Sequence, residues 1–343
     1  MNNYSVYNDP KMYRHNCAEM EDLPVASTPV FALREKEKIN HTFTSYCNYS
    51  LEDIQVMLDA IDIAIVEEVA RSKFLTSLHI YEYLGLRGID VKRPRLRKRI
   101  LKLMKLRLIQ ENEIVIPEAV HGVKYYELDI MGYLLAKEQG VRFNRGNMYL
   151  SYKKKEELNA FDTPQDVKRI LVGNQIILGL LLSNAKMERF GIMETFRVET
   201  ESENLDGCIL RTAALARIDS ESVLAFEVVR DSAEGYDKLA DKIERYYKMA
   251  HNKKYLEANH HGDDVVPQIV ICGESLEHNR KIAEYLRKKG LWDNEDVVLF
   301  TEDLLNMKDS LKSIYEITDN DEIRWYRLPE EMGRQHSSDR CSA

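Results

Sequence analysis

The stretch between Asp90 and Glu111 constrains this chain more than any other feature, because it has no acidic residue and carries nine lysines and arginines. The whole chain has 343 residues and a formal net charge of −8, so the remainder carries −17. A basic stripe on an otherwise acidic protein is typical of a contact with nucleic acid. The alternative interpretations are a basic loop and a solvated helix face.

The same stretch has the apolar pattern of an amphipathic helix. Pro94 suits a first helical turn, and Leu96, Ile100 and Leu103 follow at intervals of three or four residues. The cations fill the other positions, where they would contact phosphates or guanine edges. The predicted DNA-binding residues are Lys92, Arg93, Arg95, Arg97, Lys98, Arg99, Lys102 and Lys105.

The elements around the basic helix predict a DNA-binding domain. Apolar residues over 51–69 repeat at helical spacing, and a second helix begins at Thr76. Residues 109–117 and 123–128 predict two short strands joined by a turn. Two helices, a basic third helix and a β-ribbon in this order are the pattern of a winged helix-turn-helix, whose third helix enters the major groove.

The pattern changes after about residue 160. From 166 to 273 the expected order is helix, three strands, helix and strand, without a glycine-rich dinucleotide motif. This αβββαβ order is the core of the restriction-endonuclease-like fold, so we expect a two-domain protein of the α+β or α/β class. Its predicted parts are a flexible arm over 1–48, a winged-helix domain over 49–160, a restriction-endonuclease-like α/β domain over 161–330 and a loose tail over 331–343. The alternative for 1–48 is short pieces that dock elsewhere on the protein.

Nucleases with that fold resemble one another in an acidic residue on the second strand and an acidic-x-Lys motif on the third. The matching positions here are Asp206 and Glu227, and two carboxylates converging there would hold a Mg²⁺ that activates water. The motif's lysine position is Val229, which departs from the pattern. Lys238 or Lys242 from the following helix would have to replace it. The predicted catalytic set is therefore Asp206, Glu227 and Lys242, with Asp206 and Glu227 as metal ligands.

Both carboxylates also have structural interpretations. A charged residue inside a strand as apolar as 224–229 is costly unless it is paired, so Glu227 is expected to form an ion pair with Lys242 or Arg245 if it binds no metal. Asp206 precedes a glycine and fits a turn equally well.

Two segments of the second domain resemble a known family. Residues 226–230 and 236–246 are similar to the replication-relaxation family of Gram-positive plasmids and integrative elements. Its members combine an N-terminal winged helix with a nuclease-like α/β domain. The resemblance implies a DNA-binding accessory protein of plasmid or mobile-element replication or mobilisation, and it leaves nuclease activity open.

Our preferred hypothesis is therefore a double-stranded DNA-binding protein with a degenerate nuclease-like domain. A Mg²⁺-dependent DNA endonuclease and a winged-helix transcriptional regulator are the alternatives. The expected partners are double-stranded DNA and replication or mobilisation proteins, and a homodimer is left open.

Composition favours the cytoplasm. The five cysteines lie far apart and form no CxxC pair, which is typical of reduced thiols. The longest aliphatic run, over 176–182, is much shorter than the roughly 20 residues that span a bilayer, so no membrane contact is expected.

Overall fold

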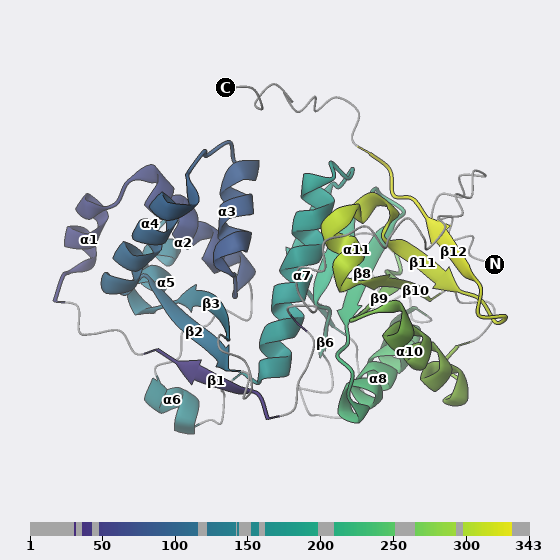
Figure 1. Cartoon of the computed structure of the whole chain (residues 1–343). Helices are drawn as coiled ribbons and strands as arrows, with labels where there is room; N and C mark the ends of the chain where they lie inside the picture. The colour runs from purple at the N-terminus through teal and green to yellow at the C-terminus, as the bar shows by residue number, and fades with distance from the viewer. Residues whose placement is uncertain are drawn as a thin grey trace.

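The computed structural model describes residues 31, 36–42, 48–115, 122–141, 143, 152–157, 162–197, 209–250, 265–292 and 298–330, and it is a mixed α+β fold (Figure 1). The helices in these ranges are α1 (Leu51–Met57), α2 (Ala60–Ser72), α3 (Ser77–Leu86), α4 (Arg93–Lys105), α5 (Ile130–Glu138), α6 (Tyr152–Glu157), α7 (Pro164–Leu182), α8 (Ala233–Ala250), α10 (Leu276–Lys288) and α11 (Asp303–Lys308). The strands are β1 (Lys38–His41), β2 (Ile109–Val115), β3 (Val123–Leu128), β4 (Arg189–Ile192), β5 (Thr195–Arg197), β6 (Ile209–Arg211), β7 (Ala214–Arg217), β8 (Val223–Val228), β9 (Gln268–Gly273), β10 (Leu299–Glu302), β11 (Ile314–Ile317) and β12 (Ile323–Tyr326).

Side-chain caps set the starts of the first helices. The sequence predicts one helix over 51–69, but the structure has two, because Asp59 caps α2 by accepting from the backbone N–H groups of Ile61 and Asp62. Thr76 caps α3 in the same way, as predicted, by accepting from the N–H of His79. The basic helix is confirmed as α4.

Three strands form a small antiparallel sheet beside these helices. β2 and β3 pair as the predicted ribbon, and Leu75 adds a bridge to Tyr126 between α2 and α3. β1 extends the ribbon by pairing with β2. The expectation of a flexible arm over 1–48 is therefore wrong for residues 36–42. They are fixed by strand pairing and by Glu37, whose carboxylate lies 2.5 Å from the ammonium of buried Lys168.

The large sheet has seven strands in the order β12-β11-β10-β9-β8-β7-β4. β8, β9 and β10 are parallel, and their other neighbours are antiparallel. The three strands expected before α8 are five in the described part of the structure, because β5 and β6 pair with each other outside the large sheet and β4 and β7 lie within it beside β8. The short edge strand β4 was not predicted.

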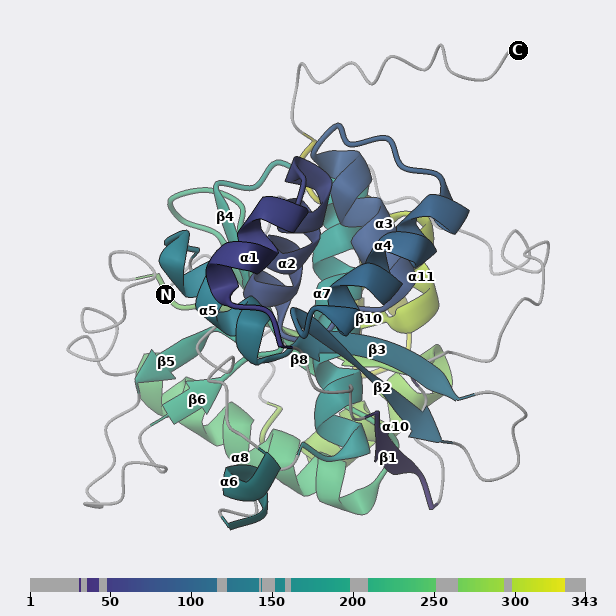
Figure 2. The ribbon, with the colours of Figure 1, turned by 90° about the vertical axis from the view of Figure 1, so that its left-hand side faces the viewer.

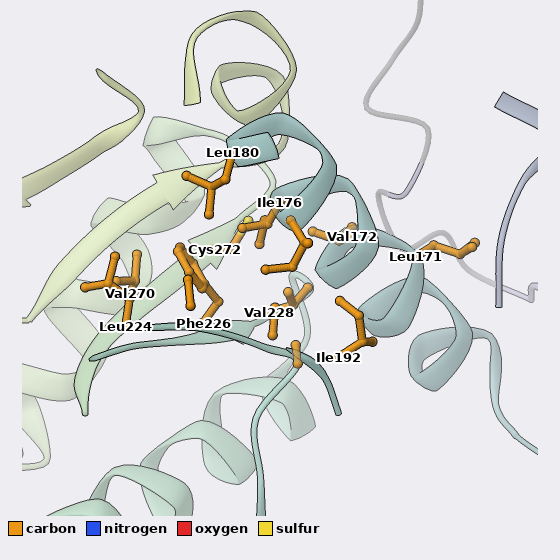
Figure 3. Close-up of a cluster of buried hydrophobic side chains, with 14 of the residues drawn as sticks. Leu171, Val172, Ile176, Leu180, Ile192, Leu224, Phe226, Val228, Val270 and Cys272 are labelled. Carbon is orange, nitrogen blue, oxygen red and sulfur yellow. The ribbon is translucent and has the colours of Figure 1, made fainter. Parts of the chain in front are cut away.

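Successive side chains of the buried strand β8 point to opposite faces of the sheet and pack into two different hydrophobic cores. Leu224, Phe226 and Val228 pack against α7 (Figure 3). Val223 and Ala225 face the other way, toward α8 and α10. Glu227 shares that second face, so the strand register places its carboxylate beside α8.

Helix α7 lies between the two sheets (Figure 1), and it packs against β4, β7 and β8 of the large sheet and against α3. Its buried Asn174 donates to the carbonyls of Ser72 and Phe74, at distances of 3.1 and 3.0 Å. Phe74 and Tyr125 join the same core cluster as the apolar face of α7. Packing is thus continuous across the boundary predicted near residue 160. Figure 2 views α1 to α5 from the side opposite α7.

Candidate nucleic-acid interface and buried glutamate

Helix α4 begins in an electrostatically unusual way. Its N-cap, Lys92, makes no side-chain capping hydrogen bond, and its first turn has no acidic residue. Instead Lys92, Arg93 and Arg95 crowd the end of the helix where the macrodipole is positive. Cations are unfavourable there and anions are favourable, so this end of α4 is suited to a phosphate group supplied from outside.

Six of the eight predicted DNA-binding residues are exposed along α4. Within the described ranges none of the six has a carboxylate at ion-pair distance, although Arg93 does lie over the ring of Tyr81, 5.3 Å from its centroid. Leu96, Ile100 and Leu103 bury the opposite face. The six exposed residues are Lys92, Arg93, Arg95, Arg97, Lys98 and Lys105.

The other cations of the basic stretch are bound to buried carboxylates. Arg99 and Lys102 contact the fully buried Asp62, at N–O distances of 2.7 and 2.6 Å. Arg107 donates to both oxygens of Asp129 at 3.1 and 3.0 Å. Arg99 and Lys102 therefore hold α4 against α2, an internal role that the sequence pattern did not reveal.

Glu227 is the centre of a second cluster. Its side chain is 2% exposed, and Lys242 of α8 places its ammonium 2.6 Å from Oε2. The hydroxyl of buried Tyr246 donates to Oε1 at 2.9 Å. The guanidinium of Arg169, on α7, lies 3.7 Å from Oε2. The predicted pairing of Glu227 with Lys242 is confirmed, whereas Arg245 makes no ion pair with Glu227.

Burial changes the acid–base behaviour of this cluster. It lowers the pKa of Lys242 to about 8, and Arg169 adds to the effect, although Glu227 opposes it. The Lys242 ammonium also donates to the carbonyl of Arg211 at 2.6 Å. Burial and the Glu227 carboxylate together raise the pKa of Tyr246 far above its usual range. The tyrosine is thus a hydrogen-bond donor at all ordinary pH values.

The described residues do not fit a Mg²⁺ site around Glu227. Its Oε2 already accepts from Lys242, with Arg169 at ion-pair distance, and its Oε1 accepts from Tyr246. Mg²⁺ prefers several oxygen ligands, and among the described residues no three His, Cys, Asp or Glu side chains gather to hold a metal. Asp206, the second predicted ligand, lies outside the described residues.

Sequence reasoning missed Arg169 and a second buried ion pair. The sequence does not set Arg169 apart, because it is one of several polar residues in the first turns of α7, beside Asp166 and Lys168. Fully buried Arg230 donates to both oxygens of Asp303 at 2.6 and 3.1 Å, directly after β8. This pair fixes the end of β8 to the start of α11.

Comparisons with protein families, with curated proteins and with solved structures find no match to this chain. None of the helices in the described ranges combines the length and the apolar character needed to cross a membrane. Function is therefore inferred from the geometry of these two clusters.

Proposed function

We propose that this protein binds double-stranded DNA, with α4 as the helix that enters the major groove. The observation that carries the proposal is the row of six exposed cations on α4, which no described carboxylate neutralises. Lysine and arginine without internal partners release counterions when they contact phosphates, which makes such binding strong at low salt.

The elements around α4 support a winged helix-turn-helix. The order α2, the Leu75 bridge, α3, α4, β2 and β3 places a three-helix unit beside an antiparallel ribbon. The ribbon would lie along the DNA backbone or minor groove while α4 reads the major groove.

The elements from α7 onward support the interpretation that this region has a restriction-endonuclease-like fold. Leaving aside the separate β5–β6 pair, the elements run α7, β4, β7, β8, α8 and β9, an αβββαβ order. Because the oxygens of Glu227 are engaged by protein donors, we propose that this domain acts as a docking scaffold and cleaves no DNA. The resemblance to the replication-relaxation family extends the proposal to an accessory role in plasmid or mobile-element replication or mobilisation, in the cytoplasm.

One gel experiment tests the proposal. Purified protein is incubated with supercoiled and linear DNA in Mg²⁺, in Mn²⁺ and in EDTA, and both mobility shift and cleavage are recorded. We expect a shift that is the same with and without metal and no cleavage. Replacing both Arg97 and Lys98 with alanine should weaken the shift.

Two results would overturn parts of the proposal. A shift that is absent at low salt, or unchanged in the Arg97→Ala/Lys98→Ala variant, would remove α4 as the interface. Metal-dependent cleavage that is abolished in Glu227→Gln would make the protein a Mg²⁺-dependent endonuclease that uses Glu227. DNA affinity retained in Glu227→Gln serves as the folding control.

A further inference from the structure

A pocket of about 200 Å³ opens between the first turns of α7 and one face of α8, with the end of β8 among its lining. It is much larger than the roughly 30 Å³ that one water occupies, so it has room for a small polyatomic ion. The pocket is distinct from the exposed face of α4. Its charged lining residues are Arg169, Glu227, Lys238, Asp241, Lys242 and Arg245.

Helical spacing gathers the cations on this pocket. Lys238, Lys242 and Arg245 are separated by four and three residues, so they lie on one face of α8. Gln165 and Arg169 are four residues apart on α7 and line the pocket across from them. Two helices thus contribute donors to one space.

The lining carries more positive than negative charge. Among the described lining residues, its four cations face Glu227 and the exposed Asp241, a net charge of +2. One of the four, Lys238, also pairs with the exposed Glu234 at 2.7 Å, outside the lining. Arg245 is half-buried and has no ion pair within the described ranges, and the side-chain amide of Gln165 makes no hydrogen bond there. Donors are therefore left over after Glu227 is satisfied.

The cations that line the pocket repel one another, and a bound anion would offset this repulsion. Arg169 and Arg245 both lower the pKa of Lys242, in addition to burial. A phosphate monoester carries about −1.5 to −2 charges at pH 7, opposite in sign to the net charge of the lining. Planar guanidinium groups also suit bidentate hydrogen bonding to phosphate oxygens.

We propose that the α7–α8 pocket binds a phosphate group without a metal ion, with Arg169, Arg245, Lys242 and Gln165 as the donors. Glu227 then has a positioning role, because it holds Lys242 and Arg169 at the pocket. The proposal does not depend on DNA binding by α4, and it is tested in a protein whose α4 face has been weakened.

The test uses the full chain carrying Arg97→Ala and Lys98→Ala, with inorganic phosphate as the probe. Calorimetric titration in EDTA, at constant ionic strength set with chloride, should show one saturable site. Adding Arg245→Met should weaken binding about tenfold or more, because it removes a charge-assisted hydrogen bond. Among the described residues no side chain loses an ion-pair or hydrogen-bond partner when Arg245 is replaced, so this variant should fold. The matched control is Lys248→Met, an exposed cation on the same helix that does not line the pocket.

Two further probes identify the source of the phosphate. A deoxynucleoside 5′-monophosphate and a short duplex with a 5′-phosphate are titrated beside inorganic phosphate, each with its dephosphorylated counterpart. Tighter binding of the nucleotide indicates a small-molecule ligand, and tighter binding of the duplex indicates a DNA end. The proposal fails if phosphate binds no better than chloride, or if Arg245→Met and Lys248→Met bind it equally well.

Discussion

The α4 face and the α7–α8 pocket are both rich in lysine and arginine, but they use the charge differently. On α4 the cations are exposed and have no described carboxylate partner, apart from Arg99 and Lys102, which are bound to Asp62. In the pocket the cations surround a glutamate that is 2% exposed. An open row suits an extended polyanion, and a pocket suits a single anionic group.

The difference shows that a count of charges does not define a binding surface. Lys98 and Arg99 are adjacent in the chain, yet Lys98 faces solvent and Arg99 lies 2.7 Å from buried Asp62. A basic residue is therefore available to bind a ligand at position 98 and stabilises the fold at position 99. Variants that separate these roles test the comparison.

The largest expected effect comes from removing the buried carboxylate of the pocket. Glu227→Ala should lower the free energy of unfolding by about 3–5 kcal/mol, because it leaves Lys242 and Arg169 without their partner. Urea unfolding measures the change. The matched control is Glu234→Ala, whose partner Lys238 is exposed and which should stay within about 0.5 kcal/mol of the parent. Equal effects of the two variants would contradict a buried charge centre.

Raising the pH should stabilise the protein through Lys242. Its pKa is about 8 in the folded state and near 10.5 when unfolded, so between these values the unfolded state binds more protons and stability rises with pH. Relative to Lys242→Met, the parent should gain up to about 3 kcal/mol from pH 8 to pH 10.5. The exposed Lys238→Met serves as the control and should show no such difference. If the difference in stability between the parent and Lys242→Met does not change with pH, Lys242 is not desolvated.

A smaller loss of stability is expected from replacing Asp62, the buried carboxylate that binds α4. Asp62→Asn should cost about 2 kcal/mol of stability, because charged hydrogen bonds to Arg99 and Lys102 are weakened while Arg99 keeps its contact with Asp59. Thermal or urea unfolding checks it against Asp90→Asn, an exposed carboxylate outside any described ion pair. If Asp62→Asn is as harmless as Asp90→Asn, Arg99 and Lys102 are free for ligands after all.

Local patterns were enough to predict α3, α4 and the β2–β3 ribbon. The spacing of Leu96, Ile100 and Leu103 indicated the basic helix, and Thr76 marked the start of α3. The partners of Arg99 and Lys102 could not be predicted, because Asp62 lies 37 and 40 residues earlier in the chain. Long-range packing brings them together, and a single sequence carries no signal for it.

The pocket was predictable only in part. A glutamate inside an apolar strand required a partner, and Lys242 on the next helix supplies it. Arg169 lies on α7, which β4, β5, β6 and β7 separate from β8 in the chain, so its contact with Glu227 depends on how the whole sheet is packed. The docking of β1 on β2 likewise joins segments about 75 residues apart, a distance over which periodicity is uninformative.

The measurement that tests the comparison most directly is the salt dependence of DNA affinity for two sets of α4 variants. The logarithm of the binding constant is plotted against the logarithm of salt concentration for the parent, for Arg97→Ala/Lys98→Ala and for Lys102→Ala. Exposed Lys137→Ala on α5 is the control. Removing one cation that binds a phosphate flattens the slope by about 0.9.

We expect Arg97→Ala/Lys98→Ala to flatten the slope by about 1.8, the effect of two phosphate-binding cations, and Lys102→Ala to change it by less than about 0.5, as for Lys137→Ala. That result would show that only cations without internal carboxylate partners bind DNA. An unchanged slope for Arg97→Ala/Lys98→Ala, or a slope flattened by about 0.9 in Lys102→Ala, would contradict the distinction between the free and the paired cations of α4.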